Sequence, residues 1–128
     1  MMRPQVTLGE LRDALASASP DAQVRFDQFG LLCRGLDSWR GVYALPAVGW
    51  CHRSAGHERP TVAGLLARVD RALAGQVFVG WKGGNYTYGH PSPIWVDNPG
   101  EVSDTALVGV TVGESDVTLH TEHREYGS

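Results

Sequence analysis

Two stretches decide the fold class expected for this chain: Thr7-Leu8-Gly9-Glu10-Leu11 and Thr61-Val62-Ala63-Gly64-Leu65. Each begins with a threonine, whose hydroxyl oxygen can accept a hydrogen bond from a free N–H group in the first turn of a helix. Glu10 completes a reciprocal capping box with Thr7, whereas Gly64 has no side chain to do the same for Thr61. Apolar residues then recur every three or four positions. Two amphipathic helices are therefore predicted, one ending at 17–19 before Pro20 and one stopped by Gly75.

A strand is expected directly after each helix. Val24 and Phe26 alternate with charged residues after the first helix, and the run 76–79 after the second is mostly apolar. Further on, 106–112 and 117–121 have the pattern of a hairpin joined by a polar turn. Shorter strands are expected at 86–88 and 94–96.

The apolar run 42–50 contains Pro46, which favours an edge strand or two short pieces. An edge of this kind can pair with a second copy of the chain, so a homo-oligomer is expected. Taken together, the segments predict a single α+β domain over residues 1–128, with two amphipathic helices packed on one face of a mostly antiparallel sheet. Residues 1–6 and 122–128 are expected to be frayed ends.

Composition narrows the classes of function. Apolar residues make up 42% of the chain and the net charge is −3 with histidine neutral, which argues against a general nucleic-acid binder. No apolar run approaches the length of a membrane span, and the first residues lack the apolar centre of a signal peptide. The two cysteines do not make a disulfide framework, so a reducing cytoplasm is the expected location.

The only lysine of the chain, Lys82, lies in the unusual stretch Gly80-Trp81-Lys82-Gly83-Gly84-Asn85-Tyr86, whereas ten arginines carry the other strong positive charges. The N–H groups of Gly83 and Gly84 could face an anion beside the lysine charge, with Trp81 stacked on a ring. The alternative is a plain hairpin turn, for which Gly-Gly is a common signal. The spacing does not fit a nucleotide-hydrolysing P-loop.

A second candidate stretch is Asp37-Ser38-Trp39-Arg40-Gly41. Arg40 could bind a phosphate or carboxylate with two parallel hydrogen bonds, and Ser38 could donate another. In the alternative interpretation the stretch is a structural turn in which Asp37 pairs with Arg40 and Trp39 fills the core. Trp50 and Trp95, flanked by apolar residues, are expected in the core.

Other polar residues give weaker signals. Cys33, Cys51, His52 and His57 do not have the spacing of a zinc module, so no metal site is expected. Asp97, Glu101 and Asp104 are expected in a solvated turn. Neither a cofactor nor a catalytic residue is predicted.

Several of these stretches also occur, in the same order, in small uncharacterised proteins of actinobacterial phages, which the chain resembles. The matching stretches are Thr7–Leu11, Asp37–Gly41, Thr61–Val62, Gly80–Thr87 and Pro93–Trp95. The resemblance implies a phage or prophage origin and a bacterial cytoplasm, and it carries no activity.

The sequence thus predicts a non-catalytic binding protein that sequesters a small nucleotide-derived ligand, such as a host immune signal bound by a phage sponge. The expected ligand-binding residues are Ser38, Trp39, Arg40, Trp81, Lys82, Gly83, Gly84 and Tyr86. Two alternatives stay open: a phage protein that binds and inhibits a host protein, and a small nucleotide-cleaving enzyme that uses Asp37, Asp97 or a histidine as base. General nucleic acid and membranes are not expected as partners.

Overall fold

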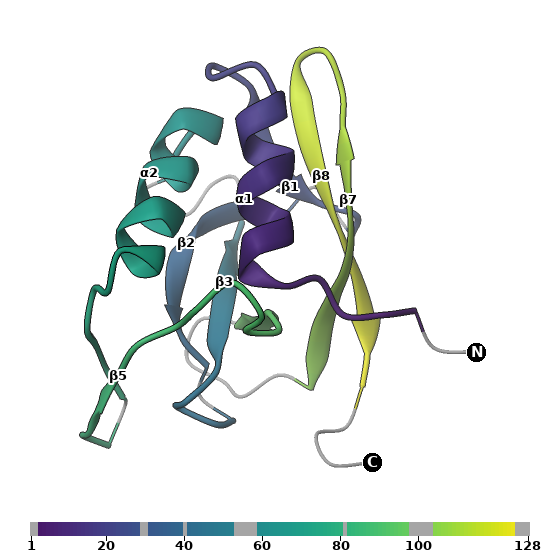
Figure 1. Cartoon of the computed structure of the whole chain (residues 1–128). Coiled ribbons are helices and arrows are strands. Elements are labelled where there is room, and N and C mark those ends of the chain that lie inside the picture. The colour runs from purple at the N-terminus through teal and green to yellow at the C-terminus, as the bar shows by residue number, and fades with distance from the viewer. Residues whose placement is uncertain are drawn as a thin grey trace.

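The computed structural model describes residues 3–28, 31–39, 41–52, 59–80, 82–97 and 104–124 (Figure 1). Two helices, α1 (Leu8–Ser17) and α2 (Val62–Leu73), accompany eight strands in this part of the chain. The strands are β1 (Gln23–Phe26), β2 (Leu32–Ser38), β3 (Pro46–Cys51), β4 (Phe78–Val79), β5 (Asn85–Tyr86), β6 (Trp95–Asp97), β7 (Thr105–Val112) and β8 (Asp116–His123). The predicted α+β class is confirmed.

Six strands form a closed barrel in the order β1-β2-β3-β6-β7-β8, and β4 pairs with β5 in a separate two-stranded sheet. The barrel is mostly antiparallel, as predicted, but β1 runs parallel to β8 and β3 runs parallel to β6. The expectation of an edge strand at 42–50 is wrong, because β3 pairs with β2 on one side and with β6 on the other. Pro46 is tolerated there because it is the first residue of the strand.

The helix ends follow the cap chemistry read from the sequence. The backbone N–H of Glu10 donates to the Thr7 hydroxyl at 3.3 Å, and the N–H of Thr7 donates to the Glu10 carboxylate at 3.0 Å. Thr61 caps α2 alone, accepting from the N–H of Gly64 at 3.4 Å. Gly75 follows α2 with a φ of 106°, a backbone conformation that favours glycine.

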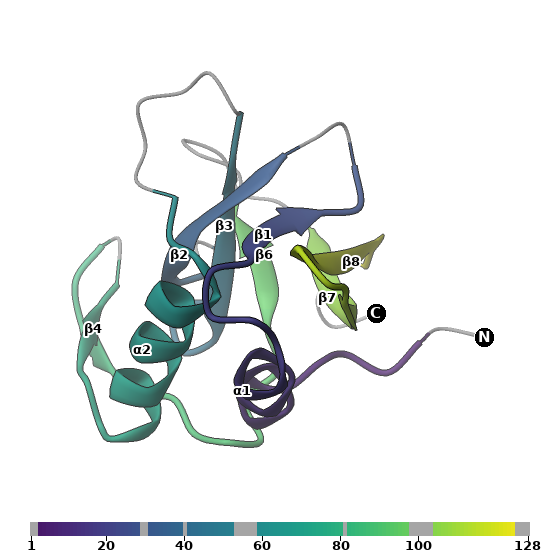
Figure 2. The same ribbon diagram turned by 90° about the horizontal axis from the view of Figure 1, so that it is seen from above.

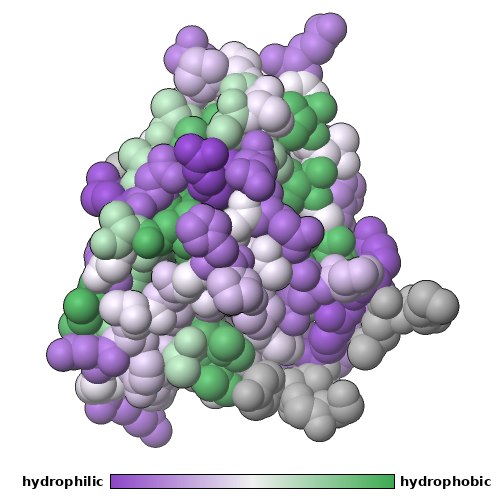
Figure 3. All heavy atoms as spheres, viewed as in Figure 1, coloured by the Kyte–Doolittle hydropathy of each residue, from purple (hydrophilic) through white to green (hydrophobic). Residues whose placement is uncertain are grey.

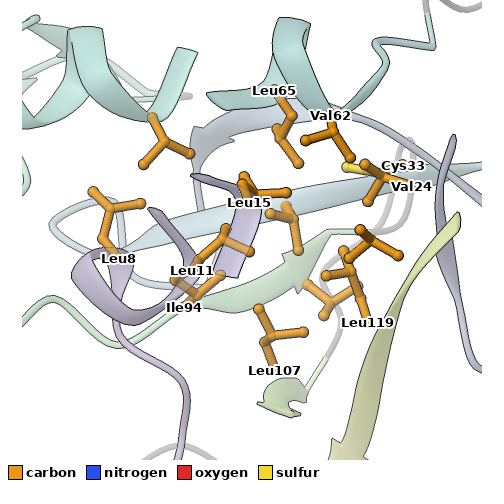
Figure 4. Packing of buried hydrophobic residues seen from close by; sticks show 14 of the residues in the cluster. Leu8, Leu11, Leu15, Val24, Cys33, Val62, Leu65, Ile94, Leu107 and Leu119 are labelled. Carbon is orange, nitrogen blue, oxygen red and sulfur yellow. The ribbon is translucent and has the colours of Figure 1, made fainter. Parts of the chain in front are cut away.

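A single apolar cluster joins both helices to all six strands of the barrel (Figure 4). The helices lie side by side (Figures 1 and 2), and Leu11 of α1 and Leu65 of α2 are both completely buried. The strands contribute residues such as Val24, Leu107 and Leu119. At roughly 25 cal/mol per Å² of apolar surface removed from water, this cluster is the main source of stability.

A second, smaller cluster lies on the opposite face of β3, β6 and β7. It contains Trp39, Ala47, Trp95, Ala106 and Val108. Because side chains alternate along a strand, Ala47 and Trp95 face this cluster while their neighbours Val48 and Val96 face the main one. Trp39 and Trp95 stack with ring centroids 4.0 Å apart and planes 5° apart. Both faces of the sheet are therefore apolar here.

The chain ends are held over much of their described length. The N–H of Val6 donates to Leu107 O at 2.8 Å, and the N–H of Ile94 donates to Val6 O at 2.9 Å. At the other end, β8 continues to His123, and the guanidinium of Arg124 donates to Arg3 O at 2.6 Å. These hydrogen bonds connect the described residues at both chain ends to the barrel and to each other.

Two neighbouring strands place two free cysteines in the barrel, where Cys33 pairs with Trp50 and Cys51 pairs with Leu32. Burial raises the pKa of the Cys33 thiol from 9.0 to about 12, and burial also raises the pKa of Cys51. The thiol of Cys33 therefore stays protonated at neutral pH and behaves as a small apolar side chain.

Removing either completely buried leucine should destabilise the whole domain. Leu11→Ala and Leu65→Ala should each lower the free energy of unfolding by about 2–5 kcal/mol, because a cavity replaces close packing. Urea unfolding measures the loss, and Asp13→Ala, whose side chain is 80% exposed, serves as the control with a change of ~0.5 kcal/mol or less. An equal, small effect of all three substitutions would contradict the shared core.

The buried thiol should also make stability fall in alkaline solution. The unfolded chain loses the Cys33 proton near pH 9, whereas the folded chain keeps it up to about pH 12, so the stabilisation is complete below pH 9 and is lost as the pH rises. This group should contribute a loss of up to about 1.4 kcal/mol per pH unit in that window. Urea unfolding at about pH 8 and about pH 10.5 should show a smaller loss for Cys33→Ala than for the native chain. Equal losses would rule out the effect.

Candidate functional site

The two candidate stretches meet at the backbone carbonyl of Tyr43. The hydroxyl of Ser38 donates to Tyr43 O at 3.0 Å, and the hydroxyl of Tyr88 donates to the same oxygen at 2.8 Å. Tyr88 lies 45 positions after Tyr43, so these bonds link the end of β2 to the segment that follows β5. Ser38 is completely buried and Tyr88 is 4% exposed. The junction is therefore a fixed part of the fold.

The segment between β2 and β3 folds back tightly to present this carbonyl. The N–H of Trp39 donates to Leu45 O at 2.8 Å, and the N–H of Leu45 donates to Val42 O at 3.0 Å. Trp39 is 1% exposed, as the alternative interpretation of its stretch required. A Cβ atom at Gly41 would lie 2.5 Å from the ring of Trp39, so glycine is needed for the chain to pass over the indole. In this arrangement Trp39 does not offer a ring face to a ligand.

The Gly80–Tyr88 stretch contains the turn and the second strand of the hairpin formed by β4 and β5. Phe78 pairs with Tyr86, the N–H of Gly80 donates to Gly84 O at 3.0 Å, and the N–H of Gly83 donates to Gly80 O at 3.0 Å. Gly83 and Gly84 have φ angles of 100° and 84°, which glycine adopts readily. The simpler interpretation, a hairpin turn, therefore accounts for both glycines. Because the N–H of Gly83 closes the turn, it does not face an anion.

The lysine of this hairpin is not used by the fold. Lys82 is exposed, and within the described residues its ammonium group makes neither an ion pair nor a hydrogen bond. In the same hairpin, Tyr86 of β5 packs near Tyr43, with ring centroids 6.4 Å apart and ring planes tilted by 58°. Tyr86 is half-buried, so part of its ring remains accessible. The hairpin thus combines an exposed positive charge, Lys82, with the partly accessible ring of Tyr86.

Two of the expected ligand-binding residues, Arg40 and Trp81, lie outside the described residues, as do His57 and Glu101. The structure therefore connects Ser38 with Tyr43, and Tyr43 with Tyr86 and Tyr88. Lys82 stands at the turn of the same hairpin.

Tyr88 remains a neutral hydroxyl donor at this junction. Burial is the main cause that raises the pKa of Tyr88, and the charges of Asp37 and Asp97 raise it further, whereas the hydrogen bond with Ser38 lowers it. A neutral phenol is what the bond to Tyr43 O requires, since a phenolate cannot donate.

Asp97 is the residue that sequence reasoning placed wrongly. It was expected in a solvated turn, but it is the last residue of β6, pairs in register with Gly49 and is 1% exposed. A buried carboxylate close enough to act on Tyr88 is unusual away from a functional or structural polar site. The apolar run directly before Asp97 was the signal that could have placed it correctly, because extending the predicted strand by one residue includes Asp97. Asp104, by contrast, is exposed as expected.

Two grooves lie elsewhere on the described surface. One of about 370 Å³ runs between the N-terminal segment, α1 and β7, and one of about 400 Å³ lies between α1 and α2. Neither is lined by an expected ligand-binding residue. On the face shown in Figure 3, hydrophobic residues are scattered among hydrophilic ones and do not form one continuous area.

Among the described residues, no group of three or more His, Cys, Asp or Glu side chains could hold a metal ion. Neither described helix has the length and apolar character needed to cross a membrane.

Comparison with known proteins assigns no family to this arrangement. No family model matches the chain, and no curated protein or solved structure matches it either. The function of the site is therefore inferred from its own residues and contacts.

Proposed function

We propose that the chain is a non-catalytic binding protein that sequesters a small nucleotide-derived ligand where the Asp37–Gly41 and Gly80–Tyr88 stretches meet. The observation that carries the proposal is the Tyr43 carbonyl, which accepts hydrogen bonds from Ser38 and Tyr88 at once. These bonds fix the hairpin that bears Lys82 against the loop that follows β2. Two stretches that are far apart in the sequence thereby contribute to one surface.

Charge and ring surface support a nucleotide-like ligand. The Lys82 ammonium has no partner within the described part of the fold, so it can bind a phosphate without breaking an internal contact. Surface ion pairs within a protein contribute only about 0–1 kcal/mol, whereas a hydrogen bond to a charged group contributes roughly 1.5–3 kcal/mol. Arg40 and Trp81 are proposed from the sequence as the second cation and the stacking ring, with Tyr86 beside them.

The resemblance to phage proteins suggests the biological setting of such a site. A protein that binds a nucleotide signal and does not cleave it would act as a sponge in the bacterial cytoplasm, lowering the free concentration of a host immune signal. A cyclic nucleotide or an ADP-ribose derivative has the required combination of phosphate and ring. The buried hydroxyls of Ser38 and Tyr88 at the junction are already engaged in holding the fold.

The two cations should be needed for binding and not for folding. Native mass spectrometry of the protein purified from its host should show one retained small molecule, which calorimetry then titrates. Lys82→Ala and Arg40→Ala should each weaken binding by about 10- to 150-fold, which corresponds to roughly 1.5–3 kcal/mol. Lys82→Ala should leave the melting temperature nearly unchanged, because Lys82 has no internal partner in the described part.

Arg71→Ala is the matched control, since Arg71 is exposed in the last turn of α2, away from the hairpin turn. An equal loss of affinity in this variant would indicate a general charge effect and would contradict the site. Absence of any retained or titratable nucleotide would reject the proposal itself.

A second candidate function, binding to another protein, is favoured by one observation. Val77 and Val79 are 53% and 66% exposed on the β4 side of the hairpin, and with Val112 they are the exposed large hydrophobic residues of the described chain. The two-stranded sheet has open edges that another strand could extend. A host protein or a second copy of the chain could pair there. Pairing with a second copy would give the expected homo-oligomer through the β4–β5 hairpin and not through the run 42–50.

This second candidate predicts contact at the hairpin in cells. A photoreactive residue at position 79 should form a covalent adduct on illumination, whereas the same residue at the exposed position 16 of α1 should not. An adduct of twice the 13.8 kDa chain mass identifies a second copy, and any other mass identifies a host partner. Equal labelling from positions 79 and 16, or none from position 79, would exclude the hairpin as an interface.

A further inference from the structure

Three polar side chains form a chain of contacts on the outer surface of the barrel: Thr111 on β7, His120 on β8 and Asp27 directly after β1. The Thr111 hydroxyl lies 2.7 Å from Nε2 of His120, and Nδ1 of His120 lies 3.8 Å from the Asp27 carboxylate. No motif in the sequence indicates this cluster, because Asp27 lies 93 positions before His120. It shares no residue with the proposed ligand site, and β7 and β8 lie away from the β4–β5 hairpin (Figure 1).

Strand register places these side chains together. Thr111 pairs with Thr118, and Gly109 pairs with His120 after a register shift between Leu107 and Gly109. Thr111 and His120 are therefore diagonal neighbours on the face opposite the buried Leu119. A bulge of this kind can redirect a side chain towards its neighbours.

The carboxylate of the cluster is firmly positioned. Its Oδ2 accepts from the N–H of Thr121 at 3.0 Å, and its Oδ1 accepts from the Thr121 hydroxyl at 2.9 Å. The backbone N–H of Asp27 also donates to Leu119 O at 3.0 Å. Asp27 thus presents a fixed negative charge to the Nδ1 side of the His120 ring.

This charge favours the imidazole tautomer that carries its proton on Nδ1, so that Nε2 is left as an acceptor. The hydroxyl of Thr111 can then donate to Nε2, as expected of a nucleophile beside its general base. The side chains of His120 and Asp27 are 32% and 25% exposed, and Thr111 is exposed. The hydroxyl is therefore accessible to a reagent from solution.

We propose that Thr111 is a nucleophilic hydroxyl, with His120 as its general base and Asp27 as the positioning residue, that accepts an acyl group from an activated ester. The Thr111 oxygen bonds to the ester carbonyl carbon while His120 Nε2 takes the hydroxyl proton. The bond to the leaving alcohol breaks, and that alcohol takes the proton from His120. The products are an acylated Thr111 and a free alcohol, so no oxidant, reductant or metal is needed. During the transfer Asp27 stabilises the imidazolium that forms.

The probe for this reaction is p-nitrophenyl acetate with the full chain. In the native protein, release of p-nitrophenolate should be accompanied by one acetyl group on Thr111, found by peptide mass spectrometry. His120→Gln should slow acetylation at this position by about 100-fold or more, the lower range for a positioned general base. Asp27→Asn should slow it less, because the base remains in place without its fixed charge.

Two further variants separate nucleophile from structure. Thr111→Ser keeps a hydroxyl and should retain acetylation at position 111, whereas Thr111→Val should lose it. Thr118→Val changes the cross-strand neighbour and should react as the native protein does. Thermal unfolding of each variant shows whether it is folded, and the serine variant tests the site even if the valine variant is not.

Three outcomes would overturn the proposal. Acetylation confined to Lys82 or to the N-terminal amine would place the reactivity elsewhere. Equal rates at position 111 in the native protein and in His120→Gln would remove the general base. Equal release of p-nitrophenolate by Thr111→Val and the native protein, without a stable acetyl group, would identify His120 itself as the nucleophile.

Discussion

Burial of one apolar cluster is the constraint on which the rest of the molecule depends. The barrel has two thin seams, since β1 pairs with β2 in register at Arg25 and Leu32 and β6 pairs with β7 at Trp95 and Ala106. At both seams, burial of the shared apolar core is the main interaction that holds the strands together, because residues from both helices and all six strands pack into it. The helices are therefore part of what closes the barrel. Both proposed sites lie on strands whose positions follow from this closure: the Tyr43 junction on the β2–β3 side, and the Thr111 cluster where β1, β8 and β7 adjoin.

The local features of the fold could be predicted from the sequence because their causes are local. A capping box needs Thr7 and Glu10 three positions apart, and the helix stripes need only a period near 3.6. The closure of the sheet could not be predicted in the same way. The parallel pairs β1–β8 and β3–β6 join segments that are distant in sequence, and an apolar run has the same appearance in an edge strand as in a strand with two neighbours. Pro46 was misleading for a related reason, since its position within the run, and not its presence, decides whether a ladder hydrogen bond is lost.

Only those features of the candidate site that depend on residue type could be predicted from the sequence. The two motifs were expected to meet, and Ser38 does lie at their junction, but the shared acceptor is a backbone carbonyl that no residue type reveals. Trp39 illustrates the converse case, because a tryptophan beside an arginine and a glycine looks the same whether it faces a ligand or another indole. Asp97 was missed because the end of β6 could not be located to one residue. The Thr111, His120 and Asp27 cluster depends on a bulge and on a register between distant strands, so no spacing in the sequence indicates it.

The two glycines that begin or end the candidate motifs have a consequence for how related sequences would be compared. Gly41 has no room for a Cβ atom above the ring of Trp39, and at Gly80 a Cβ atom would lie 2.7 Å from the backbone oxygen of Gly83. Selection on the shape of the chain alone would keep both positions unchanged. If related sequences all keep these two glycines, that would therefore be poor support for a shared ligand, although both glycines are prominent residues of the motifs. Lys82, which the described fold does not require, is the position whose persistence or loss during evolution would report on the ligand and not on the fold.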